Sequence, residues 1–331
     1  MKNDIPGNAK DPRGFPILVK KFVEWMQVQN RSETTIRYRR FHLIKFVQWC
    51  DERGIANPSE VTKQILERYK RHVHLYRKKN GKPLAIHSQR VVLAPLKTFF
   101  TWLAKQGLIL SNPAIELELP KKERHLPKHV LSIDEVERVL AQVDVNTPMG
   151  IRNRAMLETL YSTGIRRAEL TNLQLYDVDE GRGIVQVRQG KGKKDRFIPI
   201  GDRALGWINK YIREVRATHA KEQSTGPLFV SYRGGPLKPD TLSRIAKQYI
   251  TQANLGKHGS CHIFRHTAAT LMLEGGADVR YVQEQLGHEE LSSTQVYTQV
   301  SIQKLKEVYE KTHPAGGRDG SEALVAEKED E

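Results

Sequence analysis

The chain has 331 residues, a length that suits two domains, and it carries 54 Lys and Arg against 38 Asp and Glu, a formal net charge of +16. Apolar residues make up 38% of it and charged residues 28%, which favours a folded core and argues against a fully disordered chain. The two cysteines, Cys50 and Cys261, exclude a disulfide framework and a four-cysteine zinc site.

Membrane and secretory segments are not predicted. No apolar run approaches the roughly 18 residues that a membrane helix needs. The start of the chain, Met1-Lys2-Asn3-Asp4, lacks the apolar segment of a signal peptide. We therefore expect a cytoplasmic protein.

The positive charge is unevenly distributed along the chain. Residues 1–120 hold 22 basic and 10 acidic side chains, whereas residues 312–331 hold 2 and 6. A surplus of this size favours a polyanionic partner, because neutralising phosphates releases counterions. The alternative is a solvated basic surface that keeps the protein soluble.

The N-terminal part of the chain predicts an arm followed by a helical domain. Residues 1–14 contain two prolines and two glycines, which indicates a flexible arm. Apolar residues at helical spacing, with Ser32 placed to cap the second helix, predict a compact domain over residues 15–116. The predicted helices cover residues 16–29, 33–53, 61–79 and 84–106.

A second domain is predicted after a linker. The predicted linker covers residues 117–130, in which residues 119–128 are polar, basic and bounded by Pro120 and Pro127, as linkers often are. In the domain over residues 131–311, strands at 184–188 and 196–200 flank a Gly- and Lys-rich tip and predict a hairpin. The acidic residues 312–331 predict a disordered tail. Helices are predicted over residues 132–143, 149–162, 202–219, 238–253, 262–274, 278–285 and 302–311. The fold class is mainly α with a small antiparallel β hairpin or sheet.

Five short motifs in the second domain combine basic, histidine and tyrosine side chains. They are G-I-R-R-A-E-L at residues 164–170, G-K-G-K-K-D-R at 190–196, H-I-F-R-H at 262–266, L-G-H at 286–288, and Tyr297. A glycine interrupts a helical pattern just before the arginines of the first motif. The second motif occupies the predicted hairpin tip, and the third begins an amphipathic helix.

These motifs resemble the tyrosine recombinase, or phage integrase, family in its Xer-like form. The family pattern is an Arg in G-[LI]-R-x-x-E-L, a hairpin Lys in G-K-G-x-K-x-R, then H-x-x-R, L-G-H and a nucleophilic Tyr nine residues later. The matching residues are Arg166, Lys191, His262, Arg265, His288 and Tyr297. The resemblance spans residues 15–311 and implies a four-helix, SAM-like DNA-clamping domain followed by an α+β catalytic domain.

The cationic residues suit phosphodiester cleavage. Nucleophilic substitution at phosphorus builds negative charge on the nonbridging oxygens. Arginines stabilise this charge because they are permanently charged, bidentate donors. Arg166, Arg265 and His288 fit this role. Glu169 lies three residues after Arg166, on the same face of a helix, and is expected to hold its guanidinium.

The remaining residues suit proton transfer and attack. A phenol with a pKa of about 10 is a weak nucleophile until a base or a positive field assists it. Tyr297 would attack, His262 would accept its proton or a hydrogen bond, and Lys191 would protonate the leaving 5′ oxygen. The resemblance implies a 3′-phosphotyrosyl intermediate and strand exchange that need no ATP, metal or other cofactor, and the chain has no G-x-x-x-x-G-K-[ST] phosphate loop.

The resemblance also implies the partners. Double-stranded DNA would be bound by a homotetramer, or by a heterotetramer with a paralogous recombinase, in the cytoplasm at the nucleoid. The biological process would be integration and excision of a mobile element, or resolution of chromosome or plasmid dimers. The alternatives are a type IB topoisomerase-like enzyme that relaxes DNA as a monomer, and a catalytically silent DNA-binding regulator.

Several residues admit more than one interpretation. Arg167 is adjacent to Arg166, and only the family match favours Arg166, leaving Arg167 as a surface or DNA-backbone contact. Lys193, Lys194 and Arg196 are solvated hairpin charges or phosphate contacts. His262 and His266 have the spacing of a zinc pair, but position 263 is Ile and no further pair completes the ligand set.

Two helices invite functional hypotheses. The basic helix over residues 33–53 is predicted to enter the major groove of DNA, with a solvated basic face as the alternative. Its candidate DNA-binding residues are Thr35, Arg37, Tyr38, Arg39 and Arg40. The amphipathic helix over residues 301–311 would pack on its own domain or, by resemblance, on a neighbouring protomer.

Overall fold

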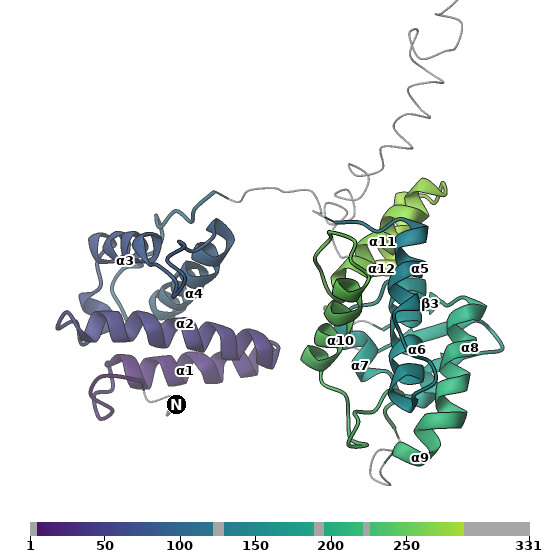
Figure 1. Cartoon of the computed structure of the whole chain (residues 1–331). Coiled ribbons are helices and arrows are strands. Elements are labelled where there is room, and N and C mark those ends of the chain that lie inside the picture. Colours follow the sequence, from purple (N-terminus) through teal and green to yellow (C-terminus); the bar gives the residue numbers. More distant parts are fainter. Residues whose placement is uncertain (1–4, 122–128, 189–194, 221–225, 288–331) are drawn as a thin grey trace, which may run out of the picture. The chain divides into compact units, whose positions relative to one another are not determined.

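The computed structural model describes residues 5–121, 129–188, 195–220 and 226–287, coloured along the chain in Figure 1. These residues are mainly helical, with one small sheet. Contacts between residues divide the chain into two compact units, residues 1–124 and residues 125–331. No helix in the described ranges is long and apolar enough to cross a membrane.

The first unit contains the helices that the apolar spacing predicts. Ser32 caps the second of them, since its hydroxyl oxygen accepts a hydrogen bond from the Thr35 amide at 3.3 Å. Aromatic rings fill the core, where Phe22 and Phe99 meet edge to face with their centroids 5.3 Å apart. The elements are α1 (Phe15–Val28), α2 (Glu33–Asp51), the 3-10 turn η1 (Pro58–Glu60), α3 (Lys63–Leu75) and α4 (Ile86–Lys105).

The third helix is shorter than the predicted range 61–79. Its last residue is Leu75, and the Lys78 amide then donates to the Lys82 carbonyl at 3.0 Å. Gly81 has φ +73°, a conformation that the Asn-Gly dipeptide favours. The turn chemistry therefore ends the helix before its apolar pattern does.

His42 is a buried polar residue of α2 in the first unit. Its side chain packs against the rings of Tyr38 and Phe41, with centroids 4.5 Å and 5.1 Å away. Neither ring nitrogen has a hydrogen-bond partner among the described residues. Burial, assisted by the charge of Lys45, lowers the pKa of His42 to about 4, so the folded protein keeps this ring neutral.

The second unit is built around α6 (Pro148–Thr163), which is buried along most of its length and packs against α8 and α11. Before and after it lie α5 (Ile133–Ala141) and α7 (Arg167–Asn172). The C-terminal half contains the helices α8 (Asp202–Tyr211), the π-helical segment η4 (Ile212–Arg216), α9 (Ala217–His219), α10 (Pro239–Gln252), α11 (Cys261–Glu274) and α12 (Val279–Leu286).

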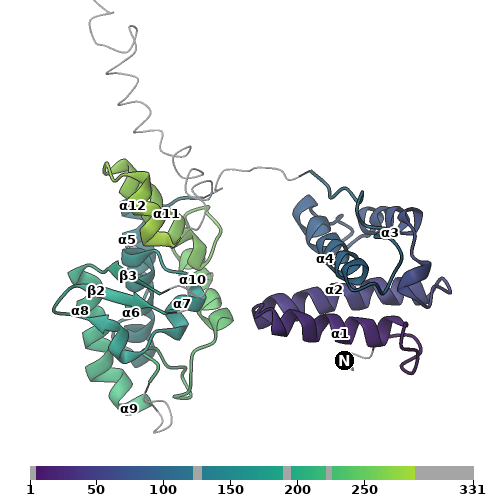
Figure 2. The ribbon, with the colours of Figure 1, turned by 180° about the vertical axis from the view of Figure 1, so that it is seen from behind.

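The sheet of the second unit is antiparallel and is seen from behind in Figure 2. The predicted hairpin forms β2 (Ile184–Val187) and β3 (Arg196–Pro199), with Val185 opposite Ile198. Both of these side chains are fully buried. A strand that the sequence analysis did not predict, β1 (Val178–Asp179), follows the 3-10 turn η2 (Leu175–Asp177) and pairs with β2. A two-residue strand is too short to show an alternating pattern.

The predicted helix over residues 202–219 is confirmed as the continuous run of α8, η4 and α9. The hairpin tip at residues 189–194, the predicted helix over residues 302–311 and the predicted tail over residues 312–331 lie outside the described residues.

Two glycines on neighbouring helices provide a test of the second unit's packing. A Cβ at Gly150, in the first turn of α6, would overlap the Asp144 carbonyl oxygen, whereas one at exposed Gly206, inside α8, would meet nothing within 4 Å. We expect Gly150→Ala to lower the free energy of unfolding by about 2 kcal/mol or more through overpacking. Gly206→Ala should raise it by about 0.5–1 kcal/mol through helix propensity. Urea unfolding followed by circular dichroism distinguishes the two, and shifts of the same sign would contradict this account.

The neutral His42 predicts an acid-sensitive first unit. In the unfolded protein the His42 ring is protonated below about pH 6.5, whereas in the folded protein it is protonated only below about pH 4. The free energy of unfolding therefore falls as the pH is lowered through this range. Between pH 6.5 and 4 we expect the free energy of unfolding to fall by about 1–2 kcal/mol more in the wild type than in His42→Leu. Tryptophan fluorescence reports it, because Trp25, Trp49 and Trp102 lie in this unit. The control His87→Leu, at an exposed site on α4, should keep the wild-type slope. Equal slopes in His42→Leu and the wild type would refute the assignment.

Candidate active site

Arg166 occupies the junction between α6 and α7. Gly164 ends α6 with φ +62°, and a Cβ there would lie 3.0 Å from the Leu286 side chain. Arg166 follows in an extended conformation as the N-cap of α7, so it is not inside a helix as predicted. The predicted contact between its guanidinium and Glu169 is present, and the Arg166 amide also donates to Glu169 Oε2 at 2.8 Å, as in a capping box.

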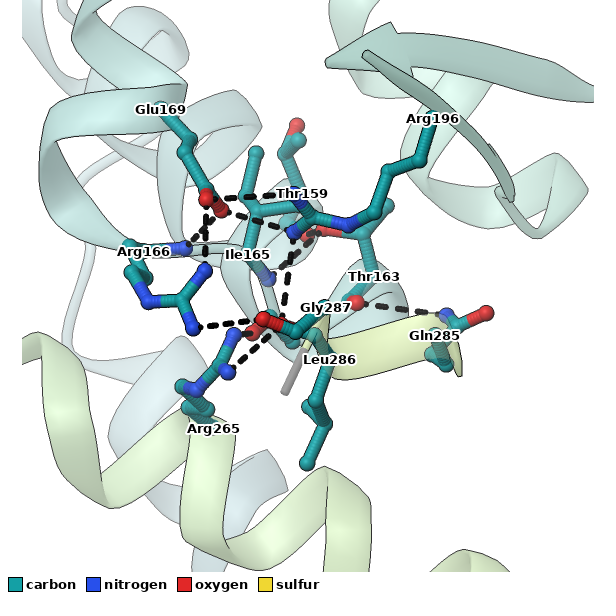
Figure 3. Close-up of polar contacts among 11 residues, drawn as sticks. Thr159, Thr163, Ile165, Arg166, Glu169, Arg196, Arg265, Gln285, Leu286 and Gly287 are labelled. Atoms are coloured by element: carbon teal, nitrogen blue, oxygen red, sulfur yellow. Dashed lines mark hydrogen bonds and ion pairs between the residues drawn. The ribbon is translucent and has the colours of Figure 1, made fainter. Parts of the chain in front are cut away.

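Glu169 is shared by two arginines (Figure 3). Its Oε1 accepts from Arg166 Nη1 at 2.7 Å and from Arg196 Nη1 at 3.1 Å, and its Oε2 accepts from Arg196 Nη2 at 2.9 Å. Burial by itself would raise the pKa of Glu169, but the hydrogen bonds from Arg196 and from the Arg166 amide lower it overall. The carboxylate is therefore ionised at neutral pH.

Arg265 comes from α11 and reaches the same place. It is 4% exposed, and it donates from Nη1 to the Gly164 carbonyl at 2.6 Å and from Nη2 to the Leu286 carbonyl at 2.7 Å. Arg166 Nη2 donates to the next carbonyl, that of Gly287, at 2.9 Å. The structure thus brings Arg166, Glu169 and Arg265 together at the end of α12, as Figure 3 shows.

His262 lies in the first turn of α11, three residues before Arg265, and is exposed on the surface of the unit. Desolvation of its ring by the neighbouring protein, followed by repulsion from Arg265, Arg167 and Arg166, lowers its pKa. The imidazole is therefore neutral at pH 7 and has a nitrogen free of a proton, which is what a proton acceptor needs.

His266 lies one turn further along α11, with its ring centroid 6.5 Å from that of His262. Burial, with the charges of His262 and Arg265, lowers the pKa of His266 to about 4. Within the described part of the chain, no group of three His, Cys, Asp or Glu side chains could hold a metal ion.

The adjacent arginines point to different partners. Arg167 Nη1 donates to Asp240 Oδ1 at 3.0 Å and to Ser243 Oγ at 2.9 Å, both near the start of α10, whereas Arg166 turns toward Glu169 and Gly287. The geometry distinguishes two residues that spacing alone left equivalent.

Lys191, His288 and Tyr297 lie outside the described residues, so their predicted roles stay predictions. The structure also adds contacts that the sequence analysis missed. The sequence predicts a solvated charge or a phosphate contact at Arg196, but its side chain is only 14% exposed and is bonded to Glu169. The G-K-G-x-K-x-R motif contained this arginine, but no local pattern indicated its burial.

The candidate DNA-binding residues of α2 divide between two faces. Thr35, Tyr38 and Arg39 line a hollow of about 290 Å³ between α2 and α4, whereas Arg37 is exposed and does not line it. Arg40 is partly exposed and does not line the hollow either. The five side chains therefore project in different directions around the helix, and their contacts with DNA stay predictions.

Comparison with known proteins identifies the class. Residues 129–304 match the family described as phage integrase family. The tyrosine recombinase XerC 2 of Ralstonia nicotianae is 48% identical over 310 residues, which cover 93% of this chain and 89% of that protein. The tyrosine recombinase XerD of Pseudomonas aeruginosa is 35% identical, with coverages of 90% and 98%.

Solved structures agree with this match. The crystal structure of XerA recombinase is 29% identical and aligns with a TM-score of 0.51 over 90% of this chain and 98% of that one. The XerH recombinase in a post-cleavage complex with difH DNA is 22% identical, with a TM-score of 0.66 over 88% and 82%, and supports the fold. The predicted fold class is confirmed.

The chain belongs to the phage integrase family of tyrosine recombinases. It is accordingly a DNA-binding, strand-transferring enzyme of site-specific recombination.

Proposed function

We propose that this chain cuts and rejoins double-stranded DNA at a specific site, with Tyr297 as the nucleophile. The phenolic oxygen attacks the scissile phosphorus, its proton passes to His262, and the bond from phosphorus to the 5′ oxygen breaks. Lys191 protonates that oxygen. A 5′ hydroxyl from another strand then attacks the phosphotyrosine, so the reverse transfer restores the tyrosine and makes a new phosphodiester.

One observation supports this proposal above the others. Arg166 and Arg265, which are 99 residues apart in the sequence, both donate to the turn formed by Leu286 and Gly287. His288 is the next residue in the chain. Two preorganised guanidinium groups suit the charge that develops on a phosphorane-like transition state, and His288 would supply a further donor.

We propose further that four protomers hold two DNA sites, either as copies of this chain or together with a paralogous recombinase. Relatives named XerC and XerD at 48% and 35% identity favour the paired form and a role in resolving chromosome or plasmid dimers. Integration and excision of a mobile element is the second candidate process. The DNA substrate would place the protein in the cytoplasm, at the nucleoid.

The nucleophile is tested by covalent capture. Incubation with sheared chromosomal DNA of the source organism, followed by sequencing of the protein-linked ends, identifies the site. A nicked duplex of that sequence should then give an adduct that survives detergent and is lost with protease. We expect Tyr297→Phe to give none, because a phenylalanine has no oxygen with which to attack. The control Tyr281→Phe, at an exposed tyrosine of α12, should react as the wild type does.

An adduct formed by Tyr297→Phe would overturn the nucleophile assignment. Relaxation of a supercoiled plasmid without the captured site, by a monomer, would favour a topoisomerase. Specific DNA binding with no adduct in the wild type would favour a silent regulator.

The two adjacent arginines provide a second test. Removing one preorganised donor to a developing oxyanion costs about 10²–10³-fold in rate, and we expect a loss of this size for Arg166→Ala. Arg167→Ala should change the single-turnover cleavage rate at saturating protein by less than about threefold, because its guanidinium is bonded to Asp240 and Ser243. Equal losses, or a larger loss for Arg167→Ala, would show that the assignment is reversed.

A further inference from the structure

Arg196 begins β3 and is bonded to the centre of the candidate site. Its two terminal nitrogens form a bidentate pair with Glu169, at 3.1 Å and 2.9 Å, and its side chain is 14% exposed. Its Nε is buried and has no hydrogen-bond partner in the described part of the chain. A surface ion pair would keep its donors in water, so this arginine is held by its surroundings and not by solvent.

The ion pair between Arg196 and Glu169 affects how Glu169 orients Arg166 and how much of the Arg166 charge it neutralises. Each carboxylate oxygen of Glu169 accepts one bond from Arg196 and one from Arg166, through the Arg166 side chain at Oε1 and its amide at Oε2. The second anchor fixes the plane of the carboxylate and hence the direction in which it holds the Arg166 fork. It also offsets the charge: one carboxylate between two guanidiniums leaves a net positive group, whereas Glu169 alone with Arg166 would be neutral.

Arg196 also touches the turn to which both other arginines donate. A Cβ built on Gly287 would lie 2.8 Å from Cζ and Nε of Arg196, so the guanidinium packs against the glycine itself. Its Nη2 lies 3.5 Å from the Leu286 carbonyl oxygen, which accepts from Arg265. Figure 3 shows Arg196 coming from the strand, with both Arg196 and Arg166 directed at the Glu169 carboxylate.

We propose that Arg196 is a positioning residue for DNA cleavage, which orients Arg166 through Glu169 and keeps the positive charge of Arg166 available to the scissile phosphate. The inference rests on the proposed function. The competing interpretation is a purely structural ion pair that stabilises the contact between β3 and α7.

The matched control is Arg188, next to the sheet. Its Nε donates to Asp177 Oδ1 at 2.6 Å, and the Asp177 side chain is 1% exposed, so Arg188→Gln also deprives a buried carboxylate of its arginine. Within the described ranges the hydrogen bonds of Arg188 go to Asp177 and Gln186, and not to Glu169, Arg166 or the end of α12. A structural loss therefore affects both variants, whereas a loss of positioning affects Arg196 alone.

The test compares Arg196→Gln, Arg196→Lys and Arg188→Gln on the nicked duplex of the captured site. At saturating protein we expect Arg196→Gln to cleave about 10–100-fold more slowly in a single turnover, by analogy with the loss of a hydrogen-bond partner that orients a metal ligand. DNA affinity should stay within about twofold, because the phosphate contacts that dominate affinity are untouched. Arg196→Lys should recover part of the rate, since it restores the charge without the fork. Arg188→Gln should lower the melting temperature and leave the rate unchanged.

A second readout isolates the charge. In a duplex with a methylphosphonate at the scissile position, one nonbridging oxygen is a methyl group, and the anion that Arg166 would neutralise is gone. Wild type and Arg196→Gln should then cleave within about threefold of each other, because positioning Arg166 no longer matters. A purely structural defect would persist with this substrate at its full size.

The outcomes separate this inference from the proposed function. If the wild type forms no adduct, the proposed function fails and this inference fails with it. If the wild type forms the adduct and Arg196→Gln cleaves at the same rate, or loses no more than Arg188→Gln, only the role of Arg196 is overturned. If Arg196→Gln does not fold, Arg196→Lys carries the same comparison on both substrates.

Discussion

The second unit has to hold several guanidinium groups close together without neutralising them. Arg166 and Arg196 share one carboxylate, that of Glu169, and Arg265 bonds to the Leu286 carbonyl, next to the Gly287 carbonyl that accepts from Arg166. Like charges gathered in this way repel. The repulsion between these cations is offset by the backbone carbonyls of Gly164, Leu286 and Gly287. Each of these carbonyls accepts a hydrogen bond from Arg166 or Arg265. These dipoles hold cations without cancelling a full charge, so the field that a phosphate would meet is preserved.

The carbonyls are available because two helices end here. The last carbonyls of a helix have no partner within it and carry the negative end of its dipole. Gly164 is the C-cap of α6 and Gly287 the C-cap of α12, and both have φ +62°. The left-handed turn releases each carbonyl from the helix, and the missing Cβ lets Arg196 pack against Gly287 and Leu286 pack against Gly164. The glycines of the G-I-R and L-G-H motifs therefore serve the arginines as directly as Glu169 does.

Local sequence patterns predicted the individual helices and strands better than they predicted which side chains come together in the site. Apolar spacing gave the helices of the first unit, and the turn signals gave the hairpin of β2 and β3, because both depend on neighbours in the chain. The convergence of Arg166 with Arg265 came from the family resemblance, since no periodicity relates residues 99 positions apart. Arg196 was missed for the same reason: a basic residue beside a hairpin tip is usually solvated, and its burial depends on Glu169 and Gly287 from two other elements. The predicted helix over residues 149–162 matches α6, but the sequence predicts Arg166 and Glu169 on the face of one helix. In the structure α7 begins at Arg167, which makes Arg166 its N-cap.

Because the guanidinium of arginine can donate to two acceptors at once, the same arginines connect the elements of the fold and supply the positive charge of the site. Arg265 joins the end of α6 to the end of α12 through two different nitrogens, and Arg166 joins Glu169 to Gly287 in the same way. A lysine ammonium, a compact charge on a flexible stem, has no rigid fork to span two acceptors with defined directions. Each guanidinium thus holds two elements of the unit together and is itself held in a defined orientation. Substitution of either arginine by lysine removes a connection between elements as well as a donor, so charge conservation alone does not preserve this site.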